Sequence, residues 1–161
     1  ATALFADGAA ASILSTKKSG KSVVASGEYT WENSLDIMGW DVMDDGLAVV
    51  FSKDIPTLVR KNFKNALIDF LSLNNLNLSD IKNFVCHPGG IKVIEALEDV
   101  FGLDSGGLDI SRDILKNFGN MSAATVLFVL ERAFYKNIKG NYLVTSLGPG
   151  FTAGFVIIKN I

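Results

Sequence analysis

Residues 84–101, FVCHPGGIKVIEALEDVF, join a short apolar strand to an amphipathic helix through a loop of proline and glycine. Residues 84–86 read as a buried strand that breaks where Pro88 enters, because proline lacks the N–H that a strand needs. From residue 92 to 101 the apolar residues recur at helical spacing. A strand that leads through such a loop into a helix is typical of α/β proteins, so this stretch predicts the fold class.

Strands and helices continue on both sides of this stretch. Upstream, the apolar pattern predicts a helix that begins at Asp54-Ile55-Pro56 and stops before Asn74, a loop over 32–45, and strands over 9–14, 23–31 and 47–51. Downstream, it predicts helices over 111–118 and from about 120 to 135, then strands over 142–146 and 151–159. This order predicts an α/β domain with a mixed sheet.

The chain is apolar for its size. Its 161 residues, taken as one domain over 1–161, are 48% hydrophobic and 20% charged, and the mean hydropathy is +0.30. Soluble domains average roughly 25% charged residues. We therefore expect a surplus of apolar surface that another domain or subunit covers. Residues 1–5, ATALF, read as a buried strand, as if the chain began in the middle of a larger fold.

Charge and cysteine content exclude several functional classes. The net charge is −2, the pI is near 5.3, and Lys and Arg form no stripe, so no nucleic-acid partner is expected. No apolar run reaches the roughly 18 residues that a membrane span needs. The single cysteine, Cys86, excludes an internal disulfide framework and favours a reducing, cytoplasmic location.

His87 is the only histidine, and it lies at the end of a predicted strand. Loops at the ends of sheet strands are where α/β proteins place their chemistry. Gly89 and Gly90 leave the imidazole without neighbouring side chains, so the backbone of a ligand could come close. A structural histidine is the alternative, and the residues themselves leave the two readings about even.

Two further motifs are ambiguous from their residues alone. In 118–124, FGNMSAA, the side chain of Asn120 could cap the following helix or donate its amide N–H into a site, and the cap is the simpler interpretation. In 147–152, LGPGFT, the residues Gly148, Pro149 and Gly150 form a rigid turn. That turn could be a plain hairpin or could line a pocket with its backbone.

The three motifs together, CHPGG at 86–90, GNMSAA at 119–124 and GPGFT at 148–152, resemble the chalcone synthase family, the type III polyketide synthases. FADGAAA at 5–11 and KDIP at 53–56 are similar to the same family, so the resemblance spans essentially the whole chain. The sequence around Trp40-Asp41 and the residues 51–54, FSKD, resemble bacterial members of the family. Val49 matches a bulky aromatic residue of the plant enzymes, while Ser146 and Leu147 replace a Gly and a Phe.

The resemblance implies the C-terminal half of a thiolase-like fold, with a mixed five-stranded sheet packed with helices. It also implies a Cys–His–Asn triad, no metal or organic cofactor, acyl-CoA and malonyl-CoA as substrates, and a homodimer. Residue by residue, His87 and Asn120 match the histidine and asparagine. Gly89, Gly90, Lys92, Val49 and the turn Gly148-Pro149-Gly150 are the expected substrate-binding and CoA-binding residues, with a solvated helix lysine as the simpler interpretation of Lys92.

These residue types suit the chemistry that the resemblance implies. Decarboxylation of a malonyl thioester builds negative charge on the thioester oxygen, and two donors aimed at that oxygen lower the barrier. An imidazole beside a cysteine also lowers the pKa of the thiol. The nucleophilic cysteine of the family belongs to the N-terminal half. Cys86 is no substitute, because neighbours on a strand point to opposite faces and Cys86 should therefore face away from the pocket that His87 enters.

Three hypotheses remain open from the sequence. The first is the C-terminal domain of a type III polyketide synthase, an acyltransferase that is inactive without its missing N-terminal half. The second is a standalone half-fold that serves as a binding or interaction module. The third is a domain of a β-ketoacyl-ACP synthase III type enzyme, which Pro88-Gly89-Gly90 disfavours. The sequence does not define the starter acyl group, the number of extensions or the mode of ring closure.

Overall fold

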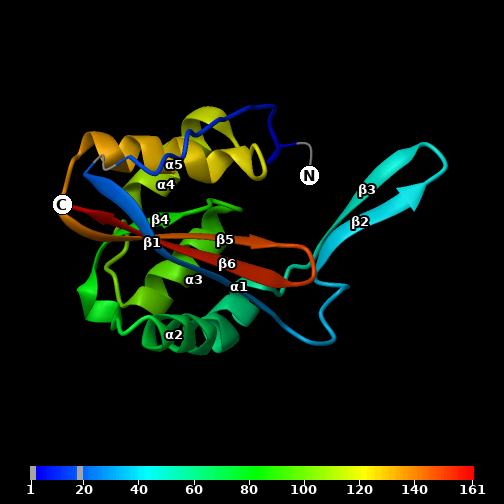
Figure 1. Ribbon diagram of the computed structural model, residues 1–161. Coiled ribbons are helices and arrows are strands. Elements are labelled where there is room, and N and C mark those ends of the chain that lie inside the picture. Colours follow the sequence, from blue (N-terminus) through cyan, green and yellow to red (C-terminus); the bar gives the residue numbers. More distant parts are fainter. Residues whose placement is uncertain (1–2, 18–19) are drawn as a thin grey trace.

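The computed structural model of the chain describes residues 3–17 and 20–161, which form three layers with a sheet in the middle (Figure 1). The sheet contains, in spatial order, β1 (Lys21–Thr30), β6 (Thr152–Asn160), β5 (Gly140–Gly148) and β4 (Ile81–Cys86). β4 runs parallel to β5, whereas β1 and β5 are both antiparallel to β6. The predicted α/β class and mixed sheet are confirmed.

One face of the sheet carries α1 (Ile55–Leu58), the π-helical turn η1 (Val59–Phe63), α2 (Lys64–Leu73) and α3 (Ile91–Phe101). The first three form one continuous run, as the apolar spacing predicts. A 3₁₀ turn, η2 (Leu78–Asp80), then leads into β4. Buried side chains of these helices form the main core against the sheet, among them Phe63, Leu67, Leu71, Ile94 and Leu97.

The opposite face carries α4 (Asp109–Phe118) and α5 (Ala124–Tyr135). A second buried cluster that includes Ile114, Val129 and Tyr142 joins them to the sheet. α5 begins later than the sequence predicts, because Ser122 has a φ of +57°, which is not helical, and so interrupts the backbone. Residues 119–123 are therefore a loop between two helices, and this loop reaches the candidate site.

β2 (Met38–Met43) and β3 (Gly46–Phe51) form a separate hairpin that projects from the body (Figure 1). The predicted strand over 47–51 is confirmed, whereas the predicted loop over 32–45 is wrong for residues 38–43. The sequence predicts a loop here because glycine and aspartate, which occur at Gly39 and Asp41, are depleted in strands. The apolar residues next to them, at 38, 40 and 42, alternate as one face of a strand requires.

The predicted strand over 9–14 is wrong, because residues 9–14 pair with no strand in the described part of the chain. This segment runs in extended form across α5 (Figure 1). Ile13 is 97% exposed and Leu14 is 78% exposed, so the apolar residues that suggested a buried strand face solvent. Of the predicted strand over 1–5, Ala1 and Thr2 lie outside the described residues, and Phe5 makes a single bridge to Asn120.

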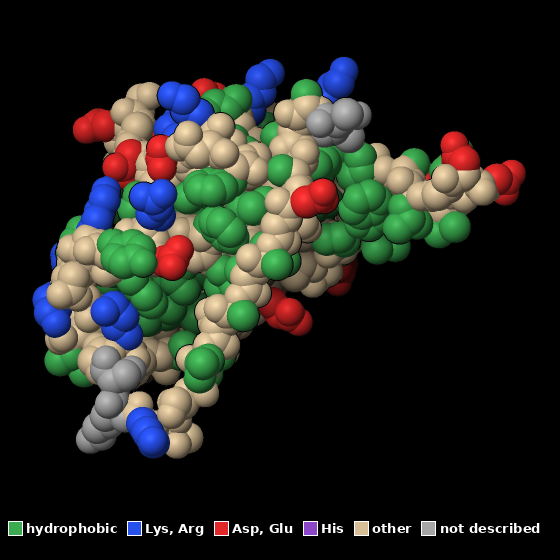
Figure 2. Space-filling view, turned by 90° about the horizontal axis from the view of Figure 1, so that it is seen from above, with side chains coloured by type: hydrophobic (Ala, Val, Ile, Leu, Met, Phe, Trp, Pro, Cys, Tyr) green, Lys and Arg blue, Asp and Glu red, His purple; other side chains and the backbone are tan. Residues whose placement is uncertain are grey.

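The described sheet has four strands where the resemblance implies five. Residues 47–51, which the sequence predicts as a strand, pair only within the projecting hairpin and do not join this sheet. Several large apolar side chains are exposed, among them Ile13, Leu14, Val42 and Leu47. Figure 2, which looks down on the α5 side, shows apolar side chains across this face and along the hairpin. In the described part of the chain, no helix is both long enough and apolar enough to cross a membrane.

Candidate active site

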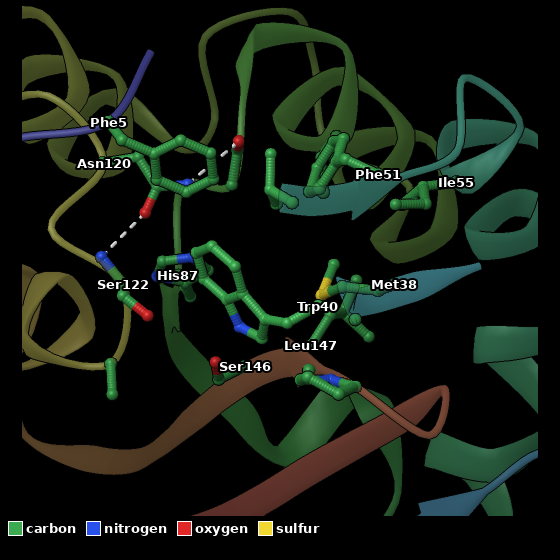
Figure 3. A pocket seen from close by; sticks show the side chains of 17 residues that line it. Phe5, Met38, Trp40, Phe51, Ile55, His87, Asn120, Ser122, Ser146 and Leu147 are labelled. Carbon is green, nitrogen blue, oxygen red and sulfur yellow. Dashed lines mark hydrogen bonds between the residues drawn. The ribbon is translucent and has the colours of Figure 1, made fainter. Parts of the chain in front are cut away.

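A pocket of about 210 Å³ opens where the ends of β4 and β5 meet the base of the hairpin and the loop 119–123. In Figure 3, His87, Asn120 and Ser122 stand at one end, and Met38, Phe51 and Ile55 stand at the other. We call His87, Gly89, Asn120 and Ser122 the polar wall. We call the hairpin side chains Met38, Trp40, Val49 and Phe51 the apolar wall.

His87 follows the last residue of β4, and its backbone N–H donates to the carbonyl of Thr145 at 2.9 Å. This bond extends the pairing of β4 with β5 by one residue, so the strand geometry sets the direction of the imidazole into the pocket. Burial lowers the pKa of His87 to about 4, which makes the ring neutral at pH 7. Nδ1 is buried and has no hydrogen-bond partner among the described residues.

Cys86 is fully buried in the main core and does not line the pocket. Burial raises the pKa of its thiol above the usual range, and the charge of Glu98 adds to that effect. Cys86 is therefore a neutral, packed thiol, as the alternation of side chains along β4 predicts. Its carbonyl accepts a hydrogen bond of 2.8 Å from Ser111 Oγ in α4, which anchors the end of β4 beside His87.

Asn120 is 2% exposed, and its carboxamide has a defined orientation. Oδ1 accepts from the backbone N–H of Ser122 at 2.9 Å, and Nδ2 donates to the carbonyl of Gly89 at 3.3 Å. The second N–H of the amide has no partner in the described part of the chain, and the side chain lines the pocket. The capping interpretation is wrong, because α5 begins at Ala124, four residues after Asn120.

Gly89 lies next to both predicted catalytic side chains. Its carbonyl holds the Asn120 amide, and a methyl group at its Cα would lie 3.9 Å from His87 Nε2. The absence of a side chain at Gly89 therefore keeps open the space beside the imidazole. The imidazole and the carboxamide thus border one small cavity, as two donors to a common acceptor would have to.

The other predicted site residues divide into two groups. Val49, Gly148 and Pro149 line the pocket together with His87, Gly89 and Asn120. Three do not line it, namely Gly90, Lys92 and Gly150. Gly90 is the N-cap residue before α3, Lys92 is exposed on that helix, and the Gly150 carbonyl lies within hydrogen-bond distance of the Ser34 hydroxyl.

Ser34 is a buried residue that no motif in the sequence singles out. Its hydroxyl accepts from the backbone N–H of Phe151 at 2.6 Å, and its single proton lies between two carbonyl acceptors, Trp31 at 2.5 Å and Gly150 at 2.9 Å. These bonds fasten the turn that follows β5 to the segment that precedes the hairpin. Ser34 therefore positions the Gly148-Pro149 part of the pocket without entering it.

Several lining residues were missed for a physical reason. They are Phe5, Met38, Gly39, Trp40, Phe51, Ile55, Val93, Ser122 and Ala123, whereas Ser146 and Leu147, which the resemblance had singled out as departures from the plant sequences, also line the pocket. Most come from segments distant from the three motifs, and the loop predicted over 32–45 gave no face to which Met38 and Trp40 could be assigned. The alternation of apolar residues at 38, 40 and 42 was the signal that could have found them.

A largely buried ion pair joins α3 to α4. Glu98 in α3 is 3% exposed, contacts Arg112 of α4 at 2.5 Å, and accepts from the backbone N–H of Leu108 at 3.0 Å. Burial alone would raise the pKa of Glu98, but these hydrogen bonds and the charge of Arg112 hold it below its usual value. The pair ties α3 to α4. Within the described ranges, no group of His, Cys, Asp and Glu side chains could hold a metal ion.

Known proteins with similar sequences point to one family. A family model described as chalcone and stilbene synthases, C-terminal domain, matches residues 23–161. A protein of Bacillus subtilis (strain 168), named as a chalcone synthase, is 38% identical over 170 residues, covering 98% of this chain and 47% of that protein. The 1,3,6,8-tetrahydroxynaphthalene synthase of Streptomyces peucetius subsp. caesius is 35% identical over 168 residues, covering 99% and 45%. The chain spans just under half the length of these relatives.

Solved structures share the fold. The crystal structure of PKS-I from the brown alga Ectocarpus siliculosus superposes with a TM-score of 0.80 at 25% identity, over 91% of this chain and 41% of that one. The crystal structure of CsyB complexed with CoA-SH superposes with a TM-score of 0.80 at 23% identity, over 90% and 42%. The fold seen here is therefore that of one part of these longer chains.

Proposed function

The chain belongs to the chalcone and stilbene synthase family, the type III polyketide synthases, as its C-terminal domain, and from this premise we propose that it supplies the histidine and the asparagine of an acyl-condensing active site. The observation that carries the proposal is the convergence of His87 and Asn120 on one small cavity beside Gly89. The whole enzyme would extend an acyl-CoA starter with malonyl-CoA by decarboxylative Claisen condensation.

The first step is decarboxylation of the malonyl thioester. The bond between the carboxylate carbon and the α-carbon breaks, carbon dioxide leaves, and the electron pair forms an enolate whose charge lies on the thioester oxygen. Nε2–H of His87 and the free N–H of Asn120 donate to that oxygen. One such donor contributes on the order of 10²–10³ in rate. A neutral imidazole is competent for this role, because Nε2 can carry the single proton.

The second step forms the new carbon–carbon bond. The enolate carbon attacks the carbonyl of an acyl group held as a thioester on a cysteine, and the cysteine leaves as thiolate. That cysteine comes from the missing N-terminal half, because Cys86 is buried away from the pocket. A thiolate beside His87 would raise the pKa of the imidazole from its depressed value, since an opposite charge stabilises the protonated ring.

The apolar wall would shape the acyl pocket. A phenolic starter needs hydrogen-bond partners for its hydroxyl groups. Among the side chains of this wall, only the Trp40 indole can form a hydrogen bond, so the wall favours an aliphatic starter. Gly89 and the backbone of Gly148 leave room for the arm of a CoA thioester. The related CsyB structure contains CoA-SH, which agrees with a CoA-linked substrate.

Two partners follow from the same proposal. The missing N-terminal half would cover the apolar side chains that α5 and the residues 9–14 leave exposed. The assembled enzyme would form a homodimer, as the family resemblance implies. The isolated chain is then an inactive domain, because it lacks the nucleophile.

The test uses the isolated chain, the N-terminal half and the full-length protein, each incubated with malonyl-CoA and an acyl-CoA. We expect carbon dioxide release and pyrone products only from the full-length protein, because the isolated chain lacks the nucleophilic cysteine and the N-terminal half on its own lacks His87 and Asn120. Turnover by the isolated chain would overturn the assignment of an absent nucleophile. Absence of activity in the full-length protein would overturn the proposed reaction.

A further inference from the structure

Residues 4–8 run alongside the loop that carries Asn120. The backbone N–H of Asn120 donates to the Leu4 carbonyl at 2.9 Å, and the Asn120 carbonyl accepts from the N–H of Ala6 at 2.9 Å. Phe5, between them, forms a parallel bridge with Asn120. Both backbone polar groups of Asn120 are thus bonded to this one short segment.

Two glycines allow the close approach. A Cβ at Gly8 would lie 2.3 Å from the sulfur of Met121, and a Cβ at Gly119 would lie 2.9 Å from the Cβ of Ala6. Both distances are shorter than side-chain atoms tolerate, so a larger residue at Gly119 would push the two segments apart, and one at Gly8 would displace the Met121 side chain. Gly119 also has a φ of +74°, a conformation that favours glycine.

The loop has little other support for the Asn120 backbone. α4 ends at Phe118 and α5 begins at Ala124, so residues 119–123 lie outside both helices. The neighbouring bonds, from Met121 N–H to Thr125 Oγ1 at 2.8 Å and from Ser122 N–H to Asn120 Oδ1, hold the residues after Asn120. In the described structure, only residues 4–6 hold the peptide groups of Asn120 itself.

We propose that residues 4–8 are a positioning segment, which sets the direction of the Asn120 carboxamide through the two backbone bonds and the glycine contacts. The segment lies outside the part of the chain that the family model matches, residues 23–161. The positioning segment contacts Asn120, which lies within the matched residues. The donor geometry at Asn120 therefore depends on residues that precede the matched domain. The role of the carboxamide as a donor rests on the proposed function, whereas the positioning itself does not.

Three substitutions isolate the backbone bond. Ala6→Pro removes the N–H that donates to the Asn120 carbonyl. Ala6→Gly keeps that N–H and serves as the conservative rescue. Ala11→Pro is the matched control, because Ala11 is an exposed alanine of the same extended segment and its N–H has no bond in the described structure.

The first readout is the pair of side-chain amide signals of Asn120 in a ¹H–¹⁵N spectrum of the chain. We expect Ala6→Pro to move them to the positions of a solvent-exposed amide, and Ala6→Gly and Ala11→Pro to leave them unchanged. Unchanged Asn120 signals in folded Ala6→Pro would overturn the proposal. If Ala6→Pro does not fold, hydrogen exchange in the unsubstituted chain decides. The backbone amides of Ala6 and Asn120 should then exchange at least about 10-fold more slowly than that of Ala11, and equal rates would overturn the proposal.

The second readout is malonyl-CoA decarboxylation by the full-length enzyme. Ala6→Pro should lower kcat by roughly 10²-fold with KM nearly unchanged, because a displacement of about 1 Å can cost that much. Ala6→Gly and Ala11→Pro should keep the wild-type kcat. A wild-type kcat in Ala6→Pro would contradict the positioning role. Absence of decarboxylation in the unsubstituted enzyme would instead contradict the proposed function, and the Asn120 signals would still decide the positioning.

Discussion

The polar wall of the pocket is held by several elements at once, whereas the apolar wall depends on one projecting hairpin. His87 is fixed by the end of β4, by its bond to Thr145, and by the Ser111 bond to the preceding carbonyl. Asn120 is fixed by Gly89, by Ser122 and by residues 4–6. The hairpin, by contrast, pairs only with itself and leaves Trp40 56% exposed and Val42 85% exposed.

The difference indicates a division of labour. Donors that stabilise a transition state must be held in advance, because their contribution depends on orientation. A wall that only selects an acyl chain by size can tolerate movement and substitution. If this division is correct, changes to the polar wall should affect the rate of chemistry for every substrate, and changes to the hairpin should affect the choice of substrate.

The largest effect is expected from removing a donor. In the full-length enzyme, His87→Ala and Asn120→Ala should each lower malonyl-CoA decarboxylation by about 10²–10³-fold. Asn65→Ala, the same change on the exposed face of α2, is the matched control and should leave the rate unchanged. Carbon dioxide release is the measurement. A wild-type rate in either wall variant would remove the proposed donor role.

A smaller effect is expected from acidification. His87 is neutral in the folded chain, with a pKa of about 4, and titrates near its ordinary value of about 6.5 when unfolded. The unfolded state therefore binds more protons between these values, and the free energy of unfolding should fall by roughly 2–3 kcal/mol as the pH drops from 7 to 4. Urea unfolding at a series of pH values measures this loss.

The variant His87→Gln controls for other titrating groups. It lacks the imidazole, so its stability should be nearly flat between pH 7 and pH 5. The pKa of Glu98 is lowered in the folded chain, so its protonation also reduces the free energy of unfolding. That loss begins only when the pH falls below the ordinary pKa range of a glutamate. An equally steep loss in His87→Gln and in the wild-type chain would show that the imidazole is not the group responsible.

A change in the apolar wall should alter selection more than chemistry. Val49→Phe fills part of the pocket, and we expect kcat/KM for a long aliphatic starter to fall by roughly 10-fold or more. Decarboxylation of malonyl-CoA should stay within about twofold of the wild-type rate. Val50→Phe, on the opposite face of β3, is the control. Equal losses in decarboxylation and in starter use would contradict the division between the two walls.

The smallest effect is expected at the tip of the hairpin. Val42 and Leu47 lie opposite one another and are 85% and 64% exposed, so Val42→Ser and Leu47→Ser should change the free energy of unfolding by no more than about 0.5 kcal/mol. They should also reduce self-association of the isolated chain, because they remove exposed apolar surface. Analytical ultracentrifugation and thermal unfolding measure the two effects. A destabilisation well above 1 kcal/mol would mean that the tip is packed in solution.

Local signals were sufficient to predict most of the fold. The spacing of apolar residues predicted α2, α3 and α4, and the breaks at Pro88 and Gly119 placed the loops that carry His87 and Asn120. These signals are short in range, so the sequence contains them completely. That the two loops converge on one pocket was predicted from the family resemblance alone, because the local sequence of one loop does not specify where the other loop lies.

Long-range pairing set the limit of prediction. Residues 9–14 have the composition of a buried strand, but a strand requires a strand to pair with, and none pairs with them in the described chain. The bonds of Ser34 to the turn at Gly150, and of Asn120 to Leu4 and Ala6, join residues more than a hundred positions apart. Serine and alanine at such positions carry no pattern that distinguishes them from ordinary loop residues.

The central claim is that His87 and Asn120 donate together to one thioester oxygen. Infrared difference spectroscopy of the full-length enzyme with acetyl-CoA, ¹³C-labelled at the thioester carbonyl, measures those hydrogen bonds directly. We predict a shift of the carbonyl band to lower frequency on binding, with part of the shift lost in His87→Ala and part in Asn120→Ala. A band at its solution frequency in the wild-type enzyme, or an unchanged shift in both variants with acetyl-CoA bound, would contradict the account.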